Sequence, residues 1–166
     1  DQLNRLREWN NGLLTRKSFY EYDDASNRSR LRIQPSGGGA DQYNVTYAYD
    51  EANRLTGVTD VLASKTAQFS YFDIGALQGV TYPNGITASY LLDPLNRLDL
   101  LQYRKSDATL ISELNYDYDP LSNVTQLVQN DTGAGGSLKT YTFGYDGLSR
   151  LTSANYENET QSYTYD

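Results

Sequence analysis

The acidic side chains are the residues of this sequence best placed to do chemistry. The chain has no His and no Cys, which excludes Ser-His and Cys-His nucleophile pairs and zinc sites of the usual ligand types. Asp23-Asp24 and the pair Asp117 and Asp119 are candidates for a glycosidase pair or a calcium site. A glycosidase needs two carboxylates at a set separation in a cleft, and an EF-hand loop needs alternating acids with a central Gly and a terminal Glu. Neither pattern occurs, so we interpret these acids as turn residues and predict no catalytic residue, no metal site and no cofactor.

Aromatic residues offer a second chemistry, the stacking of sugar rings. The chain has 16 Tyr, and aromatic residues recur two positions apart, where they point to the same face of a strand. These pairs are Tyr20 and Tyr22, Tyr47 and Tyr49, Phe69 and Tyr71, Tyr116 and Tyr118, and Tyr163 and Tyr165. Their regular repetition favours a structural ladder, in which each ring packs on the equivalent ring of the next copy, because cross-strand aromatic pairs stabilise sheets. A Tyr-rich face that binds a glycan or a protein partner is the alternative.

Net charge and composition limit the kinds of molecule that the chain could bind. The net charge of −7 argues against nucleic acid, whose phosphates need a basic surface. A chain of 166 residues fits a single domain. The sequence has no Met, which indicates a fragment of a longer protein.

The elements that would position these side chains come from an internal repeat. Each copy is anchored on an Asp that follows an aromatic or apolar residue, and Asp1 continues the series at the N-terminus. The anchors are Asp23, Asp50, Asp73, Asp93, Asp119, Asp146 and Asp166. Counted from Asp1, their spacings are 22, 27, 23, 20, 26, 27 and 20 residues, a range typical of repeats that each form one supersecondary unit.

Each copy predicts two strands and two turns. Turn-prone residues such as Glu-Ala-Asn or Pro-Leu-Ser follow the anchor, and Arg-Leu-Thr or a relative starts the next strand. An Asp carboxylate can accept a hydrogen bond from the N–H two residues on, so we expect Asp50 to bond the N–H of Ala52. The whole chain then forms an all-β antiparallel meander of about fourteen strands, two per interval between anchors. A short N-terminal helix over residues 1–12 is the one alternative.

The second turn of each copy varies in length. Asn84-Gly85 between two β-rich runs is a strong signal for a tight hairpin. The Gly-rich stretches Gln34–Gln42 and Asn130–Lys139 predict longer hairpin loops, which explain the longer spacings.

These features resemble the YD-repeat, or Rhs, family. The resemblance rests on the Tyr-Asp-x-x-x-Asn/Arg-Leu-Thr unit and the Tyr-Pro-Asn-Gly turn, and it covers nearly the whole chain as a single array, 1–166, of about seven repeats. The copy at Asp73 is the most degenerate, and the copies at Asp23 and Asp119 carry Ser-Asn in place of Asn-Arg, which we expect to shift the polar residue by one place. The residues predicted to maintain the repeat are Tyr22, Asp23, Tyr49, Asp50, Arg54, Asp73, Asp93, Arg97, Tyr118, Asp119, Tyr145, Asp146, Arg150, Tyr165 and Asp166, with Asn84 and Gly85 in the hairpin turn.

Membership of this family would imply a curved or spiralling β-ribbon that forms part of a shell. In bacterial Rhs proteins and in the C components of insecticidal toxin complexes, the shell encloses a toxic domain, and in teneurins a related shell belongs to an adhesion receptor. The implied function is a non-catalytic structural segment, with neighbouring repeats and an enclosed toxin domain as partners, in a secreted or surface-displayed bacterial protein. The Asp-Pro-x-Gly of the self-cleaving core does not carry over, since Asp93-Pro94 and Asp119-Pro120 lack the Gly. We also expect self-association through exposed edge strands.

Overall fold

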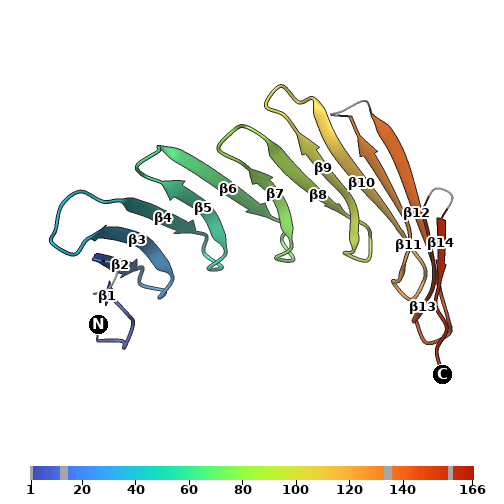
Figure 1. Ribbon diagram of the computed structural model, residues 1–166, viewed down its shortest axis with the longest axis horizontal. Coiled ribbons are helices and arrows are strands. Elements are labelled where there is room, and N and C mark those ends of the chain that lie inside the picture. Colours follow the sequence, from blue (N-terminus) through green and yellow to red (C-terminus); the bar gives the residue numbers. More distant parts are fainter. Residues whose placement is uncertain (1, 12–14, 133–135, 157–158) are drawn as a thin grey trace. The chain divides into compact units, whose positions relative to one another are not determined.

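All regular structure in the computed structural model, which describes residues 2–11, 15–132, 136–156 and 159–166, is β-strand (Figure 1). The strands are β1 (Glu8–Asn11), β2 (Arg16–Tyr22), β3 (Arg28–Pro35), β4 (Tyr43–Tyr49), β5 (Leu55–Asp60), β6 (Lys65–Tyr71), β7 (Leu77–Thr81), β8 (Thr87–Leu92), β9 (Leu98–Arg104), β10 (Leu110–Tyr118), β11 (Val124–Asp131), β12 (Ser137–Tyr145), β13 (Leu151–Tyr156) and β14 (Glu159–Ser162). The predicted all-β meander is therefore confirmed. The alternative of a short N-terminal helix is wrong for residues 2–11, which form turns and β1.

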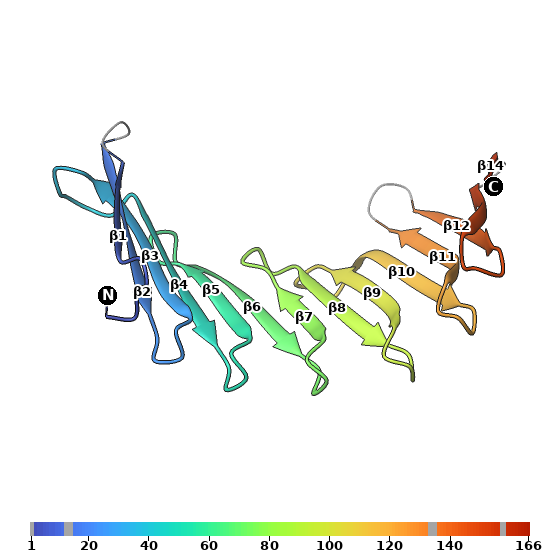
Figure 2. The ribbon, with the colours of Figure 1, turned by 90° about the horizontal axis from the view of Figure 1, so that it is seen from below.

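The strands follow one another in chain order, from β1 to β14, in a single open sheet. Two compact units divide the chain, Asp1–Ser70 with Thr81–Pro83 and Tyr71–Val80 with Asn84–Asp166. The first holds β1 to β5 and most of β6, and the second holds most of β7 and all of β8 to β14. Within each unit, the recorded contacts between strands join sequence neighbours alone, and the strands lie side by side in one layer (Figures 1 and 2).

Alternation of side chains gives each strand two unlike faces. In the second unit, Leu101 lies opposite Leu114 and Tyr116 lies opposite Leu127. These four side chains belong to the face that we call the apolar face. Positions of the other parity, such as Gln126 on β11, lie on the polar face.

A single layer leaves little of the chain buried. The apolar residues below one-tenth exposure in the described part of the chain are Val45, Val80 and Ala88. One polar residue, Asn44, is equally buried, at 4 % exposure. Stability in this fold therefore cannot come from a central hydrophobic core and depends on contacts between neighbouring strands and turns.

The turn after each anchor has one recurring backbone geometry. At Asp50, the N–H of Asn53 donates to the Asp50 carbonyl and the N–H of Asp50 donates to the Arg54 carbonyl, both at 3.0 Å. Asn53 has a φ of 59°. This is a three-residue loop formed by a tight turn and a left-handed residue, and the pairing register shifts at Ala48/Tyr49, just before the turn.

The same left-handed residue stands three places after the anchors Asp23, Asp93, Asp119 and Asp146. Its φ is 70° at Ser26, 62° at Asn96, 67° at Ser122 and 59° at Ser149. Asn, Ser and Gly recur at this place, and Asn and Gly are the residues that enter the left-handed region most readily. Asp1 lies outside the described residues, but Asn4, three places later, has a φ of 57°.

The second turns differ from one another, as their sequences predict. The hairpin predicted at Asn84-Gly85 is present as the loop between β7 and β8, where Gly85 has a φ of 82°. A Cβ at Gly85 would lie 2.9 Å from the Cβ of Ser106, so Gly is required there for both its φ and its size. The loop over residues 36–42 is present, whereas 133–135 in the other Gly-rich loop lie outside the described part of the chain.

A buried amide network supports the loop over residues 36–42, and the sequence analysis did not single it out. Asn44 accepts a hydrogen bond from Arg30 Nε at 2.9 Å and donates to Asp41 Oδ2 at 2.8 Å. Gln34 Nε2 donates to Asp41 Oδ1 at 2.7 Å. These bonds satisfy the polar groups of the buried Asn44, which would otherwise destabilise the fold.

Replacement of the left-handed residue tests the turn geometry. We expect Asn96→Val to lower the free energy of unfolding by about 1–2 kcal/mol, because a β-branched residue is strained at positive φ. Asn96→Gly should retain stability. Leu95→Val, in the same turn at 66 % exposure, is the matched control and should change the free energy by less than about 0.5 kcal/mol. Urea unfolding of the variants measures the difference, and equal losses for Asn96→Val and Leu95→Val would contradict the assignment.

Candidate functional site

The anchor carboxylate organises its turn through three hydrogen bonds. Asp50 Oδ1 accepts from the N–H of Ala52 and from the N–H of Arg54, both at 2.9 Å. Asp50 Oδ2 accepts from Arg54 Nε at 2.7 Å. The bond to Ala52 predicted from the sequence is present, and the two bonds to Arg54 clamp the start of the returning strand.

The arrangement recurs at the other Asp anchors that head a described turn. Asp93 and Asp146 accept the same three bonds, with Arg97 and Arg150 in the place of Arg54. Each of these Arg residues also forms an ion pair with its Asp at 2.6 Å. Asp166 follows Tyr165 in the same order, and the sequence ends there.

Two copies use Asn where the copies at Asp50, Asp93 and Asp146 use Arg. The expectation that Ser-Asn shifts the polar residue by one place is wrong, because Ser26 holds the left-handed position, as Asn53 does. Asn27 stands in the Arg position and bonds both carboxylate oxygens of Asp23, through its N–H at 2.8 Å and its Nδ2 at 3.1 Å. Asn123 does the same with Asp119, at 2.9 Å for both bonds.

Hydrogen bonds of this kind favour the ionised carboxylate at Asp50, Asp119 and Asp146. Bonds from the backbone and side chain of Arg54 outweigh partial burial and hold the pKa of Asp50 below its ordinary value, and equivalent bonds lower the pKa of Asp146. At Asp119 the side chain of Asn123 is the largest cause of a lowered pKa. Because the folded-state pKa is depressed, the stabilisation is present above about pH 4 and is lost as pH falls through the folded-state value.

The copy assigned to Asp73 has a different anchor. Phe72, not Asp73, exchanges the backbone bonds of the turn: its N–H donates to Ala76 O and its carbonyl accepts from Gly75 N–H, both at 2.9 Å. Gly75 is the left-handed residue, with a φ of 87°. Asp73 is an exposed residue one place inside the loop, so its assignment as a repeat anchor is wrong. The Gly three places after Phe72 is the signal that could have identified the register.

Side chains at the Arg position also link successive copies. Arg97 Nη1 donates to the carbonyl of Asp119 at 3.2 Å and to Ser122 Oγ at 3.1 Å, in the next copy. Burial acts to raise the pKa of Asp93, but the bonds from Arg97 and Leu95 outweigh it and lower that pKa. One guanidinium therefore joins the carboxylate of its own turn to the backbone of the following turn.

Similar links occur in other copies. Arg5 Nη1 donates to the carbonyl of Asp23 at 3.3 Å and to Ser26 Oγ at 3.2 Å. Asn123 Nδ2, which already bonds its own Asp, lies 3.1 Å from Ser149 Oγ. We call this series of bonds along the anchor turns the turn ladder.

Five anchors follow a Tyr directly, and this Tyr forms the second link between copies. Tyr22, Tyr49, Tyr118, Tyr145 and Tyr165 each donate their hydroxyl to a carbonyl five residues after the preceding anchor. The acceptors are, in order, Leu6 at 2.9 Å, Arg28 at 3.1 Å, Leu98 at 2.7 Å, Val124 at 3.0 Å and Leu151 at 2.7 Å. Each Tyr therefore fastens its own strand to the copy before it.

The rings of three of these Tyr residues lie against guanidinium groups, and the predicted ladder of ring on ring is not what the structure records. Arg5 lies 4.7 Å from the ring centre of Tyr22, and the equivalent distances are 4.3 Å for Arg97 and Tyr118 and 4.5 Å for Arg150 and Tyr165. A cation over an aromatic face is stabilising. The one aromatic stack recorded among the described residues, Tyr141 with Tyr156, joins two positions outside this series.

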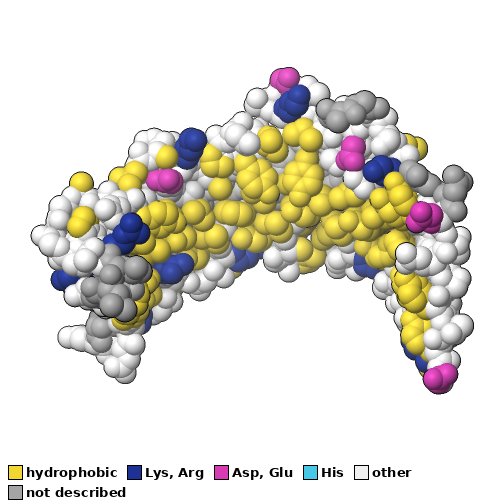
Figure 3. Space-filling model, viewed as in Figure 1, with side chains coloured by type: hydrophobic (Ala, Val, Ile, Leu, Met, Phe, Trp, Pro, Cys, Tyr) yellow, Lys and Arg dark blue, Asp and Glu magenta, His cyan; other side chains and the backbone are white. Residues whose placement is uncertain are grey.

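The apolar face is an uncharged surface. Hydrophobic side chains gather on the strands of each unit in Figure 3. In the second unit a shallow cavity of about 360 Å³ opens on this face, lined by Tyr116, Val124, Leu127, Phe143, Tyr145 and Leu151. Large aliphatic residues are also exposed at the tips of the anchor turns, namely Leu3, Ile74, Leu95, Leu121 and Leu148.

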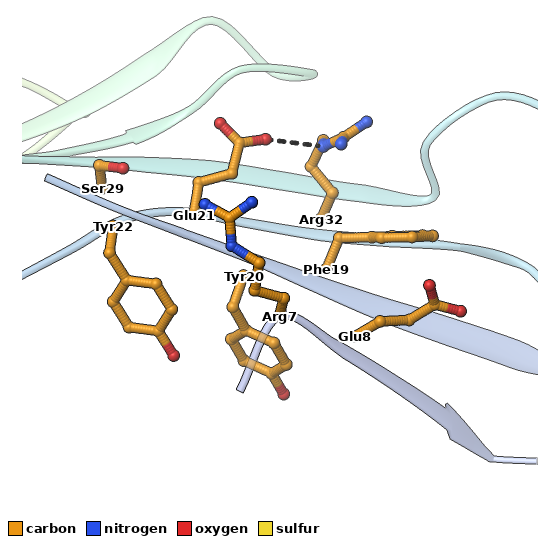
Figure 4. Close-up of a pocket in the computed structure, with 8 residues that line it drawn as sticks. All are labelled: Arg7, Glu8, Phe19, Tyr20, Glu21, Tyr22, Ser29 and Arg32. Atoms are coloured by element: carbon orange, nitrogen blue, oxygen red, sulfur yellow. Dashed lines mark ion pairs between the residues drawn. The ribbon is translucent and has the colours of Figure 1, made fainter. Parts of the chain in front are cut away.

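A more polar cleft lies at β1 and β2 in the first unit, with a volume of about 540 Å³. Figure 4 shows the rings of Tyr20 and Tyr22 on one side of β2, as predicted for residues two apart, and Glu21 on the other. Arg32 Nε lies 3.4 Å from Glu21 Oε1 and its guanidinium lies 5.4 Å from the centre of the Phe19 ring. The carboxylate of Glu21 is thus paired with a guanidinium that also lies near an aromatic ring.

The acids considered for catalysis do not meet. Asp117 lies opposite Gln126 on the polar face, whereas the carboxylate of Asp119 is bonded within its own turn. Asp24 is exposed and Asp23 is held by Asn27. Over the described ranges, no group of three potential metal-ligating residues is found and no helix is long and apolar enough to cross a membrane.

Neither a protein-family model nor a curated protein matches the sequence, but solved structures do. Crystal structures of TcdB2-TccC3-Cdc42 and TcdB2-TccC3-TEV contain a chain 21 % identical to this one, with TM-scores of 0.70 and 0.69, over 84 % of this chain and 7 % of that chain. The Tc holotoxin pore of Photorhabdus luminescens matches with 22 % identity and a TM-score of 0.66, over 83 % of this chain and 7 % of that chain.

These similarities concern the fold. The matching structures are toxin-complex chains of the Rhs/YD-repeat type, so the resemblance noted in the sequence is confirmed at the level of fold. The chain spans about 7 % of the length of the solved chains that it matches.

Removal of one Tyr hydroxyl tests the link between copies. We expect Tyr145→Phe and Tyr118→Phe each to lower the free energy of unfolding by about 1 kcal/mol, because each loses one hydrogen bond to a neighbouring copy and keeps its ring. Tyr116→Phe is the control, since Tyr116 is also half-buried but its hydroxyl has no hydrogen bond among the described residues. Urea unfolding compares the three, and a loss in Tyr116→Phe equal to the other two would contradict the proposed link.

Proposed function

We propose that this chain is a non-catalytic structural segment of a YD-repeat shell, a single array of about seven repeats within a longer secreted or surface-displayed bacterial protein. The observation that carries the proposal is that its most regular side-chain bonds, the turn ladder and the Tyr links, join one copy to the next. Such bonds build a continuous wall. Neighbouring repeats are then the first partners of the chain, and its free edge strands, β1 and β14, would self-associate when those neighbours are missing.

The large exposed area of the chain supports a role in which one of its faces contacts another polypeptide. The chain exposes 10875 Å², whereas a compact protein of 18.7 kDa exposes about 8,300 Å². The excess of about 2,600 Å² is as large as the area buried in extensive protein interfaces. The apolar face is part of this exposed surface, and no second layer covers it in the described part of the chain, so this face is suited to contact an enclosed polypeptide.

Enclosure would require more repeats than this chain holds. Fourteen strands at about 4.8 Å spacing make a sheet about 67 Å wide, which closes into a ring about 28 Å across with strands tilted by about 40°. A cargo of about 100 residues has a diameter of about 34 Å. This segment covers only 7 % of the matching solved chain, which is in keeping with that requirement.

Two neighbouring residues on β11 allow a direct test of the apolar face. Leu127 lines the apolar cavity, whereas Val128 pairs with Asn115 and Thr140 on the polar face. The chain would be titrated with a permanently unfolded polypeptide, reduced and carboxymethylated α-lactalbumin, by calorimetry. We expect Leu127→Asp to weaken binding at least about tenfold, or about 1.4 kcal/mol, and Val128→Asp to leave it unchanged.

The alternative, a glycan-binding module, is tested by the same calorimetric titrations with oligosaccharides. Saturable binding of an oligosaccharide from a glycan library, together with equal effects of Leu127→Asp and Val128→Asp on polypeptide binding, would contradict the shell proposal. The Tyr rings named above would then be candidates for the sugar-stacking surface.

A further inference from the structure

Tyr141 on β12 and Tyr156 on β13 form a stacked pair. They are direct partners in the antiparallel register, their ring centres are 4.6 Å apart and their planes differ by 11°. Both residues are half-buried, so part of each remains accessible to solvent. The pair takes no part in the turn ladder or in the Tyr links between copies.

Neighbouring groups hold the pair in place. Lys139 stands two positions before Tyr141 and therefore lies on the same face of β12. The negative charge that Tyr156 carries when ionised, and then hydrogen bonding to that side chain, raise the pKa of Lys139 above its ordinary value. On the other side of β12, Leu127 of β11 lies opposite Tyr141, so both neighbouring strands fix the position of Tyr141.

We propose that Tyr141 and Tyr156 are a site of oxidative modification, at which a haem peroxidase with hydrogen peroxide couples the two rings into dityrosine. Each phenol gives up one electron to the oxidised peroxidase and one proton to solvent, which leaves two phenoxyl radicals. The radicals combine through ring carbons ortho to oxygen, and loss of the two ortho protons restores aromaticity while the phenoxyl oxygens regain protons. Overall, two Tyr and one hydrogen peroxide give one dityrosine and two water molecules.

Proximity favours this pair over coupling between molecules. Two groups held in one molecule have an effective concentration of at least about 1 mM even on flexible linkers, which is about 200-fold above a protein concentration of about 5 µM. Stacked rings in a defined register exceed that value. The more exposed Tyr43, Tyr82, Tyr163 and Tyr165 couple between molecules, at a rate that falls as the protein is diluted.

The product would be a covalent bond between β12 and β13 that encloses the turn headed by Asp146. Separation of these strands would then no longer be possible by breaking hydrogen bonds alone. Dityrosine formation needs only the cross-strand stack of Tyr141 and Tyr156 and does not depend on the proposed shell function.

The test is peroxidase treatment of the whole chain at about 5 µM, with hydrogen peroxide, followed by separation of the monomer. We expect the blue dityrosine fluorescence in the monomer fraction, and mass spectrometry of a protease digest should show the peptide containing Tyr141 joined to that containing Tyr156. Tyr141→Phe and Tyr156→Phe should each lower the monomer fluorescence at least about fivefold, since removal of either phenol abolishes the intramolecular reaction. Tyr116→Phe, on the same apolar face, should leave it unchanged.

The Phe variants keep the ring and therefore the stack, and circular dichroism checks that each retains its strands. If one variant does not fold, the other together with the peptide map decides the question. Monomer fluorescence that persists in Tyr141→Phe, a map that joins other tyrosines, or dityrosine found only in cross-linked dimers would overturn the proposal.

Discussion

One carboxylate accepting hydrogen bonds from its own turn is the interaction on which the rest of this structure depends. At Asp50, bonds to Ala52 and Arg54 close a three-residue loop and fix the place where the next strand starts. The register of each hairpin follows from that place, because a shift of one residue would move every side chain to the opposite face. At Asp93 the carboxylate also holds the Arg97 guanidinium, which reaches the next copy, so a local turn interaction contributes to the alignment of neighbouring copies.

Dependence on neighbours follows from the absence of a second layer. With only Val45, Val80 and Ala88 buried among the apolar residues that the structure describes, each copy lacks a core and gains its stability from the copies on either side, as in other repeat arrays. Polar contacts of Tyr hydroxyls, guanidinium groups and Asp carboxylates align each copy with its neighbours. The apolar face is left available, which is the physical reason that the fold suits a wall and not a self-contained globule.

The sequence predicted the strands better than the contacts between them. Alternating Tyr pairs and regularly spaced Asp residues were sufficient for an antiparallel meander, because strand periodicity and turn chemistry are local properties. The register at Asp73 was misassigned, since an acid beside Phe72 resembles an anchor and only the backbone shows that Gly75 is the left-handed residue. The ring partners were also misjudged. Which side chain of the preceding copy meets Tyr118 depends on the bulge before the turn and on the reach of Arg97, and neither follows from periodicity.

Thermal unfolding of three Asp→Ala variants, measured side by side, tests most directly whether the anchor carboxylates are structural. Asp50→Ala and Asp146→Ala remove equivalent carboxylates and should lower the Tm by similar amounts, a few degrees each. Asp73→Ala removes an exposed acid that heads no turn and should leave the Tm unchanged. A Tm that falls equally in all three variants would contradict the account, and so would an anchor Asp whose removal leaves stability intact but abolishes a measurable activity.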